Sequence, residues 1–316
     1  MKRALIIACY IGKLPESINM WIKSCAYNKD YDFMLVTDDK LYDDIPENIT
    51  VLSQSLDDLK KRFQKCLDFN ISLEKPYKLC DFKPLYGIAF EEYVREYEFW
   101  GHCDVDMVFG NISSFYTNEI FDKYDRIGTY GHLILYRNNY EINNLYKKKG
   151  TPFSYKKVFT SKYNYGFDEQ YGYNMLCKKY EIKWYDCGHK YCLDKKRTLP
   201  YSFSETDNYE HQAVVFKNGK IYHVYDDGRD VIYKEKIYYH FTGTKYNLKK
   251  LSDEIVFEYN ECRNLNDDIR LYLSKRSVKC DRGLSLLVRI NAFWRRSLYQ
   301  KYIFIKQKIY YYVLWR

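Results

Sequence analysis

The first hundred residues alternate between short apolar runs and segments with helical spacing. Largely apolar runs, typical of strands buried on both faces of a sheet, lie at 4–9, 33–36, 49–52 and 99–103. Segments with an apolar residue every three or four positions lie between them, at 16–26, 56–67 and 83–93. This order predicts an α/β fold with a Rossmann-type, mostly parallel, twisted sheet flanked by helices. We expect ligands to bind beyond the carboxyl ends of its strands.

The remainder of the chain has a less regular pattern. Further candidate strands lie at 127–130, 133–136, 214–216 and 237–241. Residues 249–281 resemble a helical connection, and residues 282–316 differ from all the rest in charge.

Composition narrows the class of protein. The chain has 316 residues, of which 46% are hydrophobic and 29% charged, proportions that exclude wholesale disorder. Its formal charge of +9 suggests an anionic partner, such as nucleic acid, a membrane surface or a phosphorylated ligand. No stretch reaches the roughly 18 uncharged apolar residues of a spanning helix. The ten cysteines form no Cys-x-x-Cys pair, so we expect reduced thiols and a cytoplasmic location.

The positive charge is concentrated in the last 35 residues. Segment 282–316 contains eight basic residues and no acidic one, which leaves 43 basic against 42 acidic residues in the body. Its apolar positions recur every three or four residues, which predicts one continuous amphipathic helix. Such a helix suits an anionic membrane surface, here the inner face of the cell membrane; the alternative is packing on the domain. A nearly neutral body argues against nucleic-acid binding.

An acidic pair follows the predicted strand 99–103. Asp104 and Asp106 could supply oxygen ligands to a hard divalent cation that also holds a diphosphate. The spacing alone says little, because the chain has a second such triplet, Asp30-Tyr31-Asp32. A capped turn is the alternative interpretation.

The surrounding sequence adds a resemblance. Residues 77–112, YKLCDFKPLYGIAFEEYVREYEFWGHCDVDMVFGNI, are similar to the core of bacterial GT-A-fold glycosyltransferases from polysaccharide gene clusters. Those proteins share a Lys-Pro helix, a Phe-Trp-Gly strand and an Asp-x-Asp followed by Phe-Gly. The resemblance implies that Asp104 faces the ribose and the metal, and that Asp106 is a direct metal ligand.

A second segment resembles the same class of enzyme. Residues 239–245, YHFTGTK, are similar to the His-Phe-x-Gly-x-x-Lys-Pro-Trp motif of the glycogenin-like family 8 glycosyltransferases. The resemblance implies that His240 completes the metal site, and that Gly243 and Lys245 hold the diphosphate. Here Gly243 and Lys245 are one residue closer together and Tyr246 follows in place of proline, so the stereochemistry stays open. The alternative for His240 is a hydrogen-bonded residue at a strand end.

Other polar side chains lie on the same predicted edge. Tyr10 could stack on a base, and Thr37 and Asp38 could bind base or ribose, although turn formation would also explain them. Lys78 and Lys83 could contact phosphate or base; the alternative is that they are simply exposed lysines.

The acceptor side is less well marked. His132 leads into a strand of the kind that lines the acceptor side in such enzymes. Asp168 and Glu169 lie in a segment that resembles the Asp-Gln region near the reacting sugar of the glycogenin-like group. They could act as a general base or stabilise an oxocarbenium-like transition state; a helix N-terminus is the alternative.

These observations together predict a glycosyltransferase of hexosyl type that depends on Mn²⁺ or Mg²⁺. It would move sugar from a nucleotide diphosphate donor, UDP-sugar first, to a saccharide or lipid-linked acceptor in surface polysaccharide synthesis. The catalytic domain would span 1–248, with a nucleotide-binding half at 1–110 and an acceptor half at 111–248. A nucleotidyltransferase or a non-catalytic scaffold on the membrane is the alternative.

Overall fold

The structure is a computed structural model of the chain. It describes residues 3–41, 44–188, 190–195, 202–204, 207–242, 246, 252–257, 262–265, 268–274, 290–291 and 293–314. The predicted phosphate-binding residues Gly243 and Lys245 lie outside this set.

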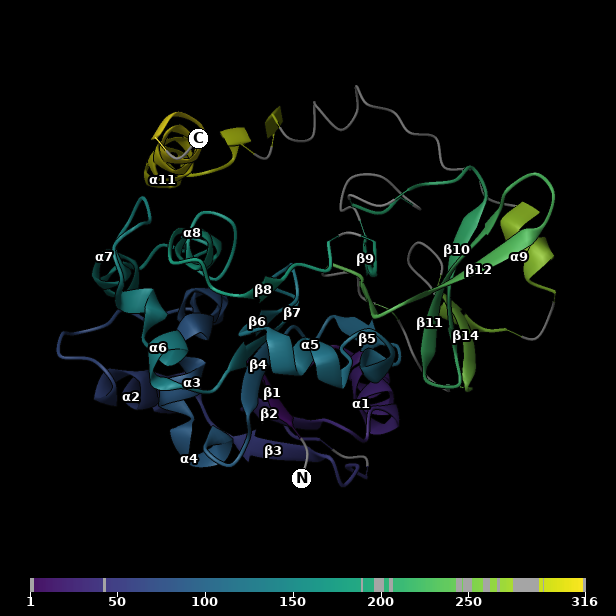
Figure 1. Ribbon diagram of the computed structural model, residues 1–316, viewed down its shortest axis with the longest axis horizontal. Helices are drawn as coiled ribbons and strands as arrows, with labels where there is room; N and C mark the ends of the chain where they lie inside the picture. The colour runs from purple at the N-terminus through teal and green to yellow at the C-terminus, as the bar shows by residue number, and fades with distance from the viewer. Residues whose placement is uncertain are drawn as a thin grey trace.

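A seven-stranded sheet forms the centre of the molecule (Figure 1), in the order β3-β2-β1-β4-β7-β6-β8. Its strands are β1 (Ala4–Cys9), β2 (Asp32–Thr37), β3 (Ile49–Ser53), β4 (Phe99–Cys103), β6 (Arg126–Ile127), β7 (Leu133–Arg137) and β8 (Trp184–Tyr185). Strands β1 to β4 run parallel, and β7 is antiparallel to both β4 and β6. The predicted α/β fold with a mostly parallel sheet and flanking helices is confirmed.

Helices cover both faces of this sheet. They are α1 (Ile18–Tyr27), α2 (Leu56–Lys65), the 3-10 helix η1 (Pro76–Leu85), α3 (Tyr86–Ala89), α4 (Glu91–Val94), α5 (Asn118–Lys123), α6 (Tyr140–Asn143), α7 (Tyr155–Thr160) and α8 (Tyr173–Lys179). Alternate residues of β1 enter two cores: Leu5 and Ile7 pack beside α2 and α3, whereas Ala4 and Ile6 pack beside α1. This double burial explains the uninterrupted apolar run of β1.

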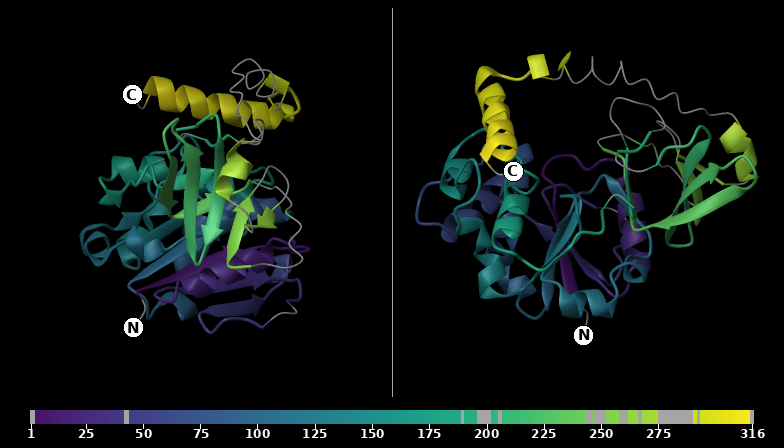
Figure 2. Two further views of the ribbon diagram at one scale, coloured as in Figure 1. Left: turned by 90° about the vertical axis from the view of Figure 1, so that its right-hand side faces the viewer. Right: turned by 45° about the horizontal axis from the view of Figure 1, so that its top comes forward.

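Two smaller sheets lie beside the central one (Figures 1 and 2). The antiparallel sheet β12-β11-β10-β14-β15 consists of β10 (Gln212–Lys217), β11 (Lys220–Asp226), β12 (Val231–Lys236), β14 (Glu254–Phe257) and β15 (Cys262–Asn264), and α9 (Ile269–Ser274) packs on it. The sheet β5-β13-β9 consists of β5 (Met107–Phe109), β13 (Tyr238–His240) and β9 (Cys192–Asp194). Because β5 follows β4 directly, this three-stranded sheet begins at the carboxyl edge of the central sheet.

Two sequence predictions for the C-terminal part are wrong. Strands β14 and β15 occupy part of the predicted helical connection 249–281, because β14 pairs with β10 from Val214 to Lys217. The predicted continuous helix 282–316 is interrupted at Ser297, whose ψ of 158° is not helical. Ser297 caps α11 (Leu298–Ile309) through a reciprocal pair of hydrogen bonds with Gln300, the arrangement that starts a helix. A short π-helix, η4 (Tyr310–Leu314), follows.

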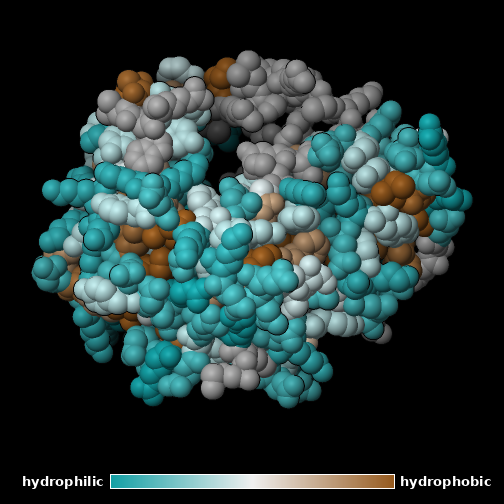
Figure 3. All heavy atoms as spheres, in the orientation of Figure 1, coloured by the Kyte–Doolittle hydropathy of each residue, from teal (hydrophilic) through white to brown (hydrophobic). Residues whose placement is uncertain are grey.

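Helix α11 lies above α7 and α8 (Figures 1 and 2). The face of the molecule in Figure 3 is mainly hydrophilic, with hydrophobic side chains gathered in separate patches. Among the described residues, no helix combines the length and the hydropathy needed to cross a bilayer.

Candidate functional site

Two aspartates follow β4 at the carboxyl edge of the central sheet, where the sequence predicted them. The backbone N–H of Asp104 donates to the carbonyl of His132 at 3.0 Å, and the carbonyl of Asp106 accepts from the N–H of Phe241 at 3.0 Å. Their side chains are 29% and 28% exposed, respectively. Both carboxylates are therefore fixed through the backbone and remain accessible to a ligand.

His240 lies against both aspartates. Strand β13 pairs with β5 so that His240 stands opposite Met107. The imidazole Nε2 is 3.3 Å from Oδ1 of Asp106 and 3.9 Å from Oδ2 of Asp104. Burial lowers the pKa of His240, but hydrogen bonds with Asp106 and Asp194 and the charge of Asp104 outweigh it and raise the pKa to about 10. A protonated His240 therefore balances the neighbouring carboxylates.

Asp194 belongs to this site although no sequence pattern singled it out. Parallel pairing of β9 with β13 places Asp194 opposite His240. Its Oδ1 lies 2.8 Å from Nδ1 of His240 and accepts a second bond from the hydroxyl of Thr242 at 2.8 Å. Burial would raise the pKa of Asp194, but the bond with His240 keeps it below its ordinary value. The ionised carboxylate thus holds Nδ1–H of His240 and leaves Nε2 facing Asp104 and Asp106.

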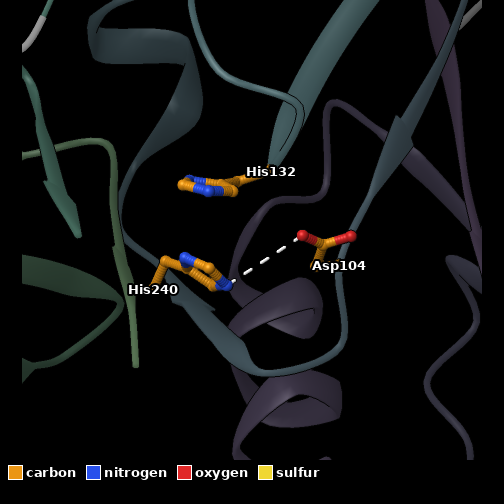
Figure 4. Close-up of side chains that lie close together, drawn as sticks. All are labelled: Asp104, His132 and His240. Carbon is orange, nitrogen blue, oxygen red and sulfur yellow. Dashed lines mark ion pairs between the residues drawn. The ribbon is translucent and has the colours of Figure 1, made fainter. Parts of the chain in front are cut away.

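His132 lies over the imidazole of His240 (Figure 4). Their ring centroids are 3.8 Å apart, with 35° between the planes. One ligand atom each from Asp104, His132 and His240 lies within 4.8 Å of the others. Burial lowers the pKa of His132 to about 4, so its ring is neutral, the form that binds metal. The sequence assigns no ligand role to His132, which leads into β7, but its ring stands beside the predicted metal ligands.

The donor set fits a divalent cation. Carboxylate oxygens suit Mg²⁺ and Mn²⁺, and imidazole nitrogen shifts the preference of a site toward transition metals. Asp104 and Asp106, two of the three predicted ligands, both lie within 3.9 Å of Nε2 of the third, His240. His132 adds a second imidazole beside them.

Lys83 connects this cluster to a second acidic group. Its ammonium nitrogen is 2.8 Å from Oδ1 of Asp104 and 3.3 Å from Oδ2 of Asp168, and it donates to the carbonyl of Gly131 at 3.0 Å. Burial opposes its charge, but the two carboxylates raise the pKa of Lys83 well above its ordinary value. In the structure Lys83 thus bridges Asp104 and Asp168 through ion pairs, in place of the predicted contact with phosphate or base.

Asp168 and Glu169 reach the same place from the loop before α8. Asp168 is 3% exposed, and burial raises its pKa to about 8 against the opposing charge of Lys83. Glu169 is exposed at the surface, although partial burial of its carboxyl still raises its pKa above the ordinary value. A Cβ atom at Gly131 would lie 3.2 Å from both Oδ2 of Asp168 and Cγ of Glu169. The absence of a side chain at Gly131 therefore lets both acids pack closely against the backbone there.

The predicted nucleotide-side residues lie after β1 and β2. Oδ1 of Asp38 accepts a hydrogen bond from the N–H of Gly12 at 2.7 Å, which ties the two strand ends together. Thr37 is buried, and its hydroxyl accepts from the N–H of Asp39 at 3.2 Å. Partial burial and the charge of Asp106 raise the pKa of Tyr10, so Tyr10 is near enough to the acidic pair to feel its charge.

Lys78 does not reach the site. It is 2% exposed and forms an ion pair with Asp81 at 2.7 Å. It also donates to the carbonyls of Val158 at 2.8 Å and Tyr163 at 2.6 Å. These three contacts use all its donors, so the predicted role of Lys78 in phosphate or base binding is wrong, and the residue anchors the fold instead.

Several solved glycosyltransferase structures are similar to parts of the chain. The galactosyltransferase LgtC in complex with donor and acceptor sugar analogues matches 60% of this chain and 75% of its own, at 8% identity and a TM-score of 0.37. Mouse xyloside xylosyltransferase 1 matches 62% and 88%, at 8% identity and a TM-score of 0.38. The glycosyltransferase GlyE of Streptococcus pneumoniae TIGR4 matches 58% and 45%, at 12% identity and a TM-score of 0.31. These similarities are too distant to carry a conclusion about activity.

Sequence comparison gives a firmer result for the family. No curated protein matches the chain significantly. A family model described as "Family of unknown function (DUF6625)" matches residues 6–265, a stretch that includes every residue of the site above. The chain therefore belongs to the DUF6625 family.

Proposed function

We propose that this protein is a metal-dependent glycosyltransferase that transfers a sugar, of hexosyl type, from a nucleotide diphosphate donor. UDP-sugar is the donor we favour, and the acceptor is a saccharide or lipid-linked saccharide of surface polysaccharide synthesis. One observation carries the proposal: Asp104, Asp106 and His240, selected from two separate sequence segments, meet at the carboxyl edge of the sheet, with Nε2 of His240 within 3.9 Å of both carboxylates. Such an edge is the usual ligand site of open α/β sheets.

The three residues Asp104, Asp106 and His240 would hold the Mn²⁺ or Mg²⁺ ion. When bound, the cation supplies positive charge that stabilises the departing diphosphate. Asp194 keeps His240 oriented toward the ion, because its carboxylate accepts the Nδ1 proton. Tyr10 and Asp38 lie at the neighbouring strand ends and would contact base and ribose. Lys245, by the resemblance to family 8, would contact the diphosphate.

Asp168 and Glu169 would have different roles in this reaction. Asp168 is almost fully buried and pairs with Lys83, so it positions Lys83 and, through it, Asp104. Glu169 is exposed beside Gly131 and is the acid that can touch a sugar. Glu169 would accept the proton of the acceptor hydroxyl in an inverting reaction or stabilise an oxocarbenium-like transition state in a retaining one.

Nucleotide release from a panel of nucleotide sugars tests the activity. We expect release of UDP that requires Mn²⁺ and an acceptor, is abolished by EDTA and falls at least 100-fold in Asp106→Asn, which loses an ionised ligand. Asp30→Asn is the matched control, because Asp30 begins the other Asp-x-Asp triplet and hydrogen-bonds the Ser113 hydroxyl at 2.6 Å, away from the cluster. Metal-independent turnover, or an Asp106→Asn variant as active as Asp30→Asn, would overturn the proposal.

The same assay separates the alternatives. A nucleotidyltransferase would consume a nucleoside triphosphate and a sugar phosphate and release pyrophosphate. A scaffold would bind the nucleotide sugar in a thermal-shift titration without turning it over. Neither would show acceptor-dependent UDP release.

We also propose that the C-terminal segment binds an anionic membrane surface from the cytoplasmic side. The support is the side-chain exposure of its apolar residues, such as 68% for Trp294, 84% for Leu298 and 70% for Val313. Basic residues lie among them along the segment, the combination that suits an interfacial helix. We expect the protein to sediment with phosphatidylglycerol vesicles but not with phosphatidylcholine vesicles. Equal binding to both would show that the basic residues do not contribute to membrane binding.

A further inference from the structure

Helix α11 has two different faces. One face packs on the body: Ile303 and Gln307 are 3% and 6% exposed, and Ile303 belongs to the larger hydrophobic core. The opposite face exposes apolar side chains to 47–84% of their surface, at Leu298, Tyr302, Ile305 and Ile309. At about 100° per residue, Lys301 and Lys308 fall on one side of this exposed stripe and Lys306 on the other.

The packed face contacts the loop that carries the two candidate catalytic acids, residues 163–172. The side-chain amide of Gln307 donates to the carbonyl of Tyr165 at 2.7 Å, a fully buried hydrogen bond. The hydroxyls of Tyr165 and Tyr299 are 3.2 Å apart, and the ring of Tyr299 lies 4.5 Å from that of Tyr163. The helical segment thus holds the start of the loop.

The end of the loop is held as well. The ring of Tyr311, in η4, lies 5.5 Å from the ring of Tyr171, and Nζ of Lys308 lies 5.4 Å from the centre of the same ring. Asp168 and Glu169 lie between these two contact points in the sequence. Helix α11 and η4 therefore contact the loop on both sides of its acids.

The body holds the loop from a different direction. The Asp81 carboxylate accepts hydrogen bonds from the N–H of Tyr165 at 2.9 Å and of Phe167 at 2.8 Å, and Lys78 neutralises its charge. Tyr165 is therefore bound through its N–H to the body and through its carbonyl and hydroxyl to α11. Loss of the Gln307 amide alone would leave a buried carbonyl without this partner, which costs more than the loss of an exposed hydrogen bond.

We propose that α11 is a positioning element for the 163–172 loop, and that binding of its exposed face to an anionic lipid surface fixes the loop for catalysis. The lipid surface is the occupant that fits, because apolar side chains flanked by lysines on both sides match acyl chains beneath anionic headgroups. The catalytic part of this inference rests on the proposed function; the structural part does not. In the proposed enzyme, sugar transfer is thus coupled to the membrane that carries the lipid-linked acceptor.

Hydrogen exchange of the full chain tests the contact without any substrate. In Gln307→Leu and in Tyr299→Phe, amides of 163–172 should exchange about fivefold faster, the factor that corresponds to a hydrogen bond of about 1 kcal/mol. Tyr302→Phe is the matched control, since it removes the same hydroxyl from the exposed face of the same helix. Wild-type exchange in Tyr299→Phe, which keeps the ring and its packing, would overturn the positioning role even if Gln307→Leu is unstable.

Vesicles test the coupling. Phosphatidylglycerol vesicles should slow exchange in 163–172 and raise kcat toward a soluble acceptor several-fold, whereas phosphatidylcholine vesicles should do neither. Ile305→Ser combined with Ile309→Ser should weaken vesicle binding roughly tenfold or more, because two apolar side chains no longer enter the bilayer, and should remove both effects. Vesicle binding that leaves loop exchange unchanged would overturn the coupling. Slower exchange without any sugar transfer would instead overturn the proposed function and leave the coupling standing.

Discussion

The Asp194→Asn substitution tests how the candidate metal site orients His240. The change keeps the size of the side chain and its position opposite His240 in the β9–β13 pair. It removes the negative charge that accepts Nδ1–H of His240 at 2.8 Å. The new amide can present either oxygen or nitrogen to Nδ1, so the tautomer with Nε2 free for the ion is no longer enforced.

The expected loss can be worked from this geometry. A hydrogen bond to a charged group contributes about 1.5–3 kcal/mol, and each 1.4 kcal/mol is about tenfold in an equilibrium constant. Carboxylates that orient a metal-binding histidine are worth about 10–100-fold in affinity. We therefore expect the dissociation constant for Mn²⁺ to rise by about 10–100-fold, with little change in the fold.

Calorimetric titration of the apoprotein with MnCl₂, in the absence of nucleotide sugar, measures this constant. Asp226→Asn is the matched control, since Asp226 is an exposed carboxylate at the end of β11 that accepts from the N–H of Gly228 at 2.8 Å. A Mn²⁺ affinity within twofold of the control would refute the positioning role.

Three further substitutions test a charge at the site, a buried histidine in β11 and the backbone of the 163–172 loop. Lys83→Met should lower the free energy of unfolding by about 3 kcal/mol in a urea titration, because Asp104 and Asp168 lose the cation between them; a change below about 0.5 kcal/mol would contradict the bridge. Burial lowers the pKa of His223 from 6.5 to about 3, so between these two pH values His223 is protonated in the unfolded chain but not in the folded one. The free energy of unfolding should therefore fall by about 1.4 kcal/mol for each pH unit as the pH is lowered from about 6.5 to about 3. His223→Gln should flatten that part of the pH–stability curve. An unchanged slope would show that another group causes the loss of stability at low pH. Gly172→Ala would place a Cβ atom in collision with the carbonyl oxygen of Phe167, so we expect a lower Tm and faster hydrogen exchange in 163–172; a wild-type Tm and wild-type exchange would show that the turn accommodates the added methyl group.

The parts of the site that the sequence predicted are those marked by local pattern. Asp104 and Asp106 directly follow an apolar strand, which placed them at the ligand edge of the sheet, whereas His240 was joined to them by the resemblance of residues 239–245 to the family 8 motif. Asp194 and His132 have no such mark. Asp194 ends a three-residue strand, and only its parallel pairing with β13 brings it to His240.

The errors have equally local causes. Lys78 is predicted to contact phosphate or base, with an exposed lysine as the alternative, but tertiary packing buries it against Asp81. The interruption at Ser297 did have a sequence signal, a serine followed three residues later by Gln300, which is a capping box. Strand β14 also had one in its run Glu254-Ile255-Val256-Phe257, rich in residues that favour strands.

The charge of the chain separates into two systems with different purposes. At the candidate site, Lys83 and a protonated His240 balance the negative charges of Asp104 and Asp106. The charge of this cluster is therefore balanced without basic residues from the rest of the surface. The net charge of +9 belongs mostly to segment 282–316, where eight basic residues have no acidic neighbour in the sequence. Charge that does not serve the site is available for a surface, and the described part of that segment holds the 163–172 loop with the face opposite its exposed apolar stripe. A lipid surface that binds this stripe would therefore act on Glu169 through the contacts that the helix makes with the loop, which are the polar contacts of Tyr299 and Gln307 and the contact of Lys308 with the ring of Tyr171.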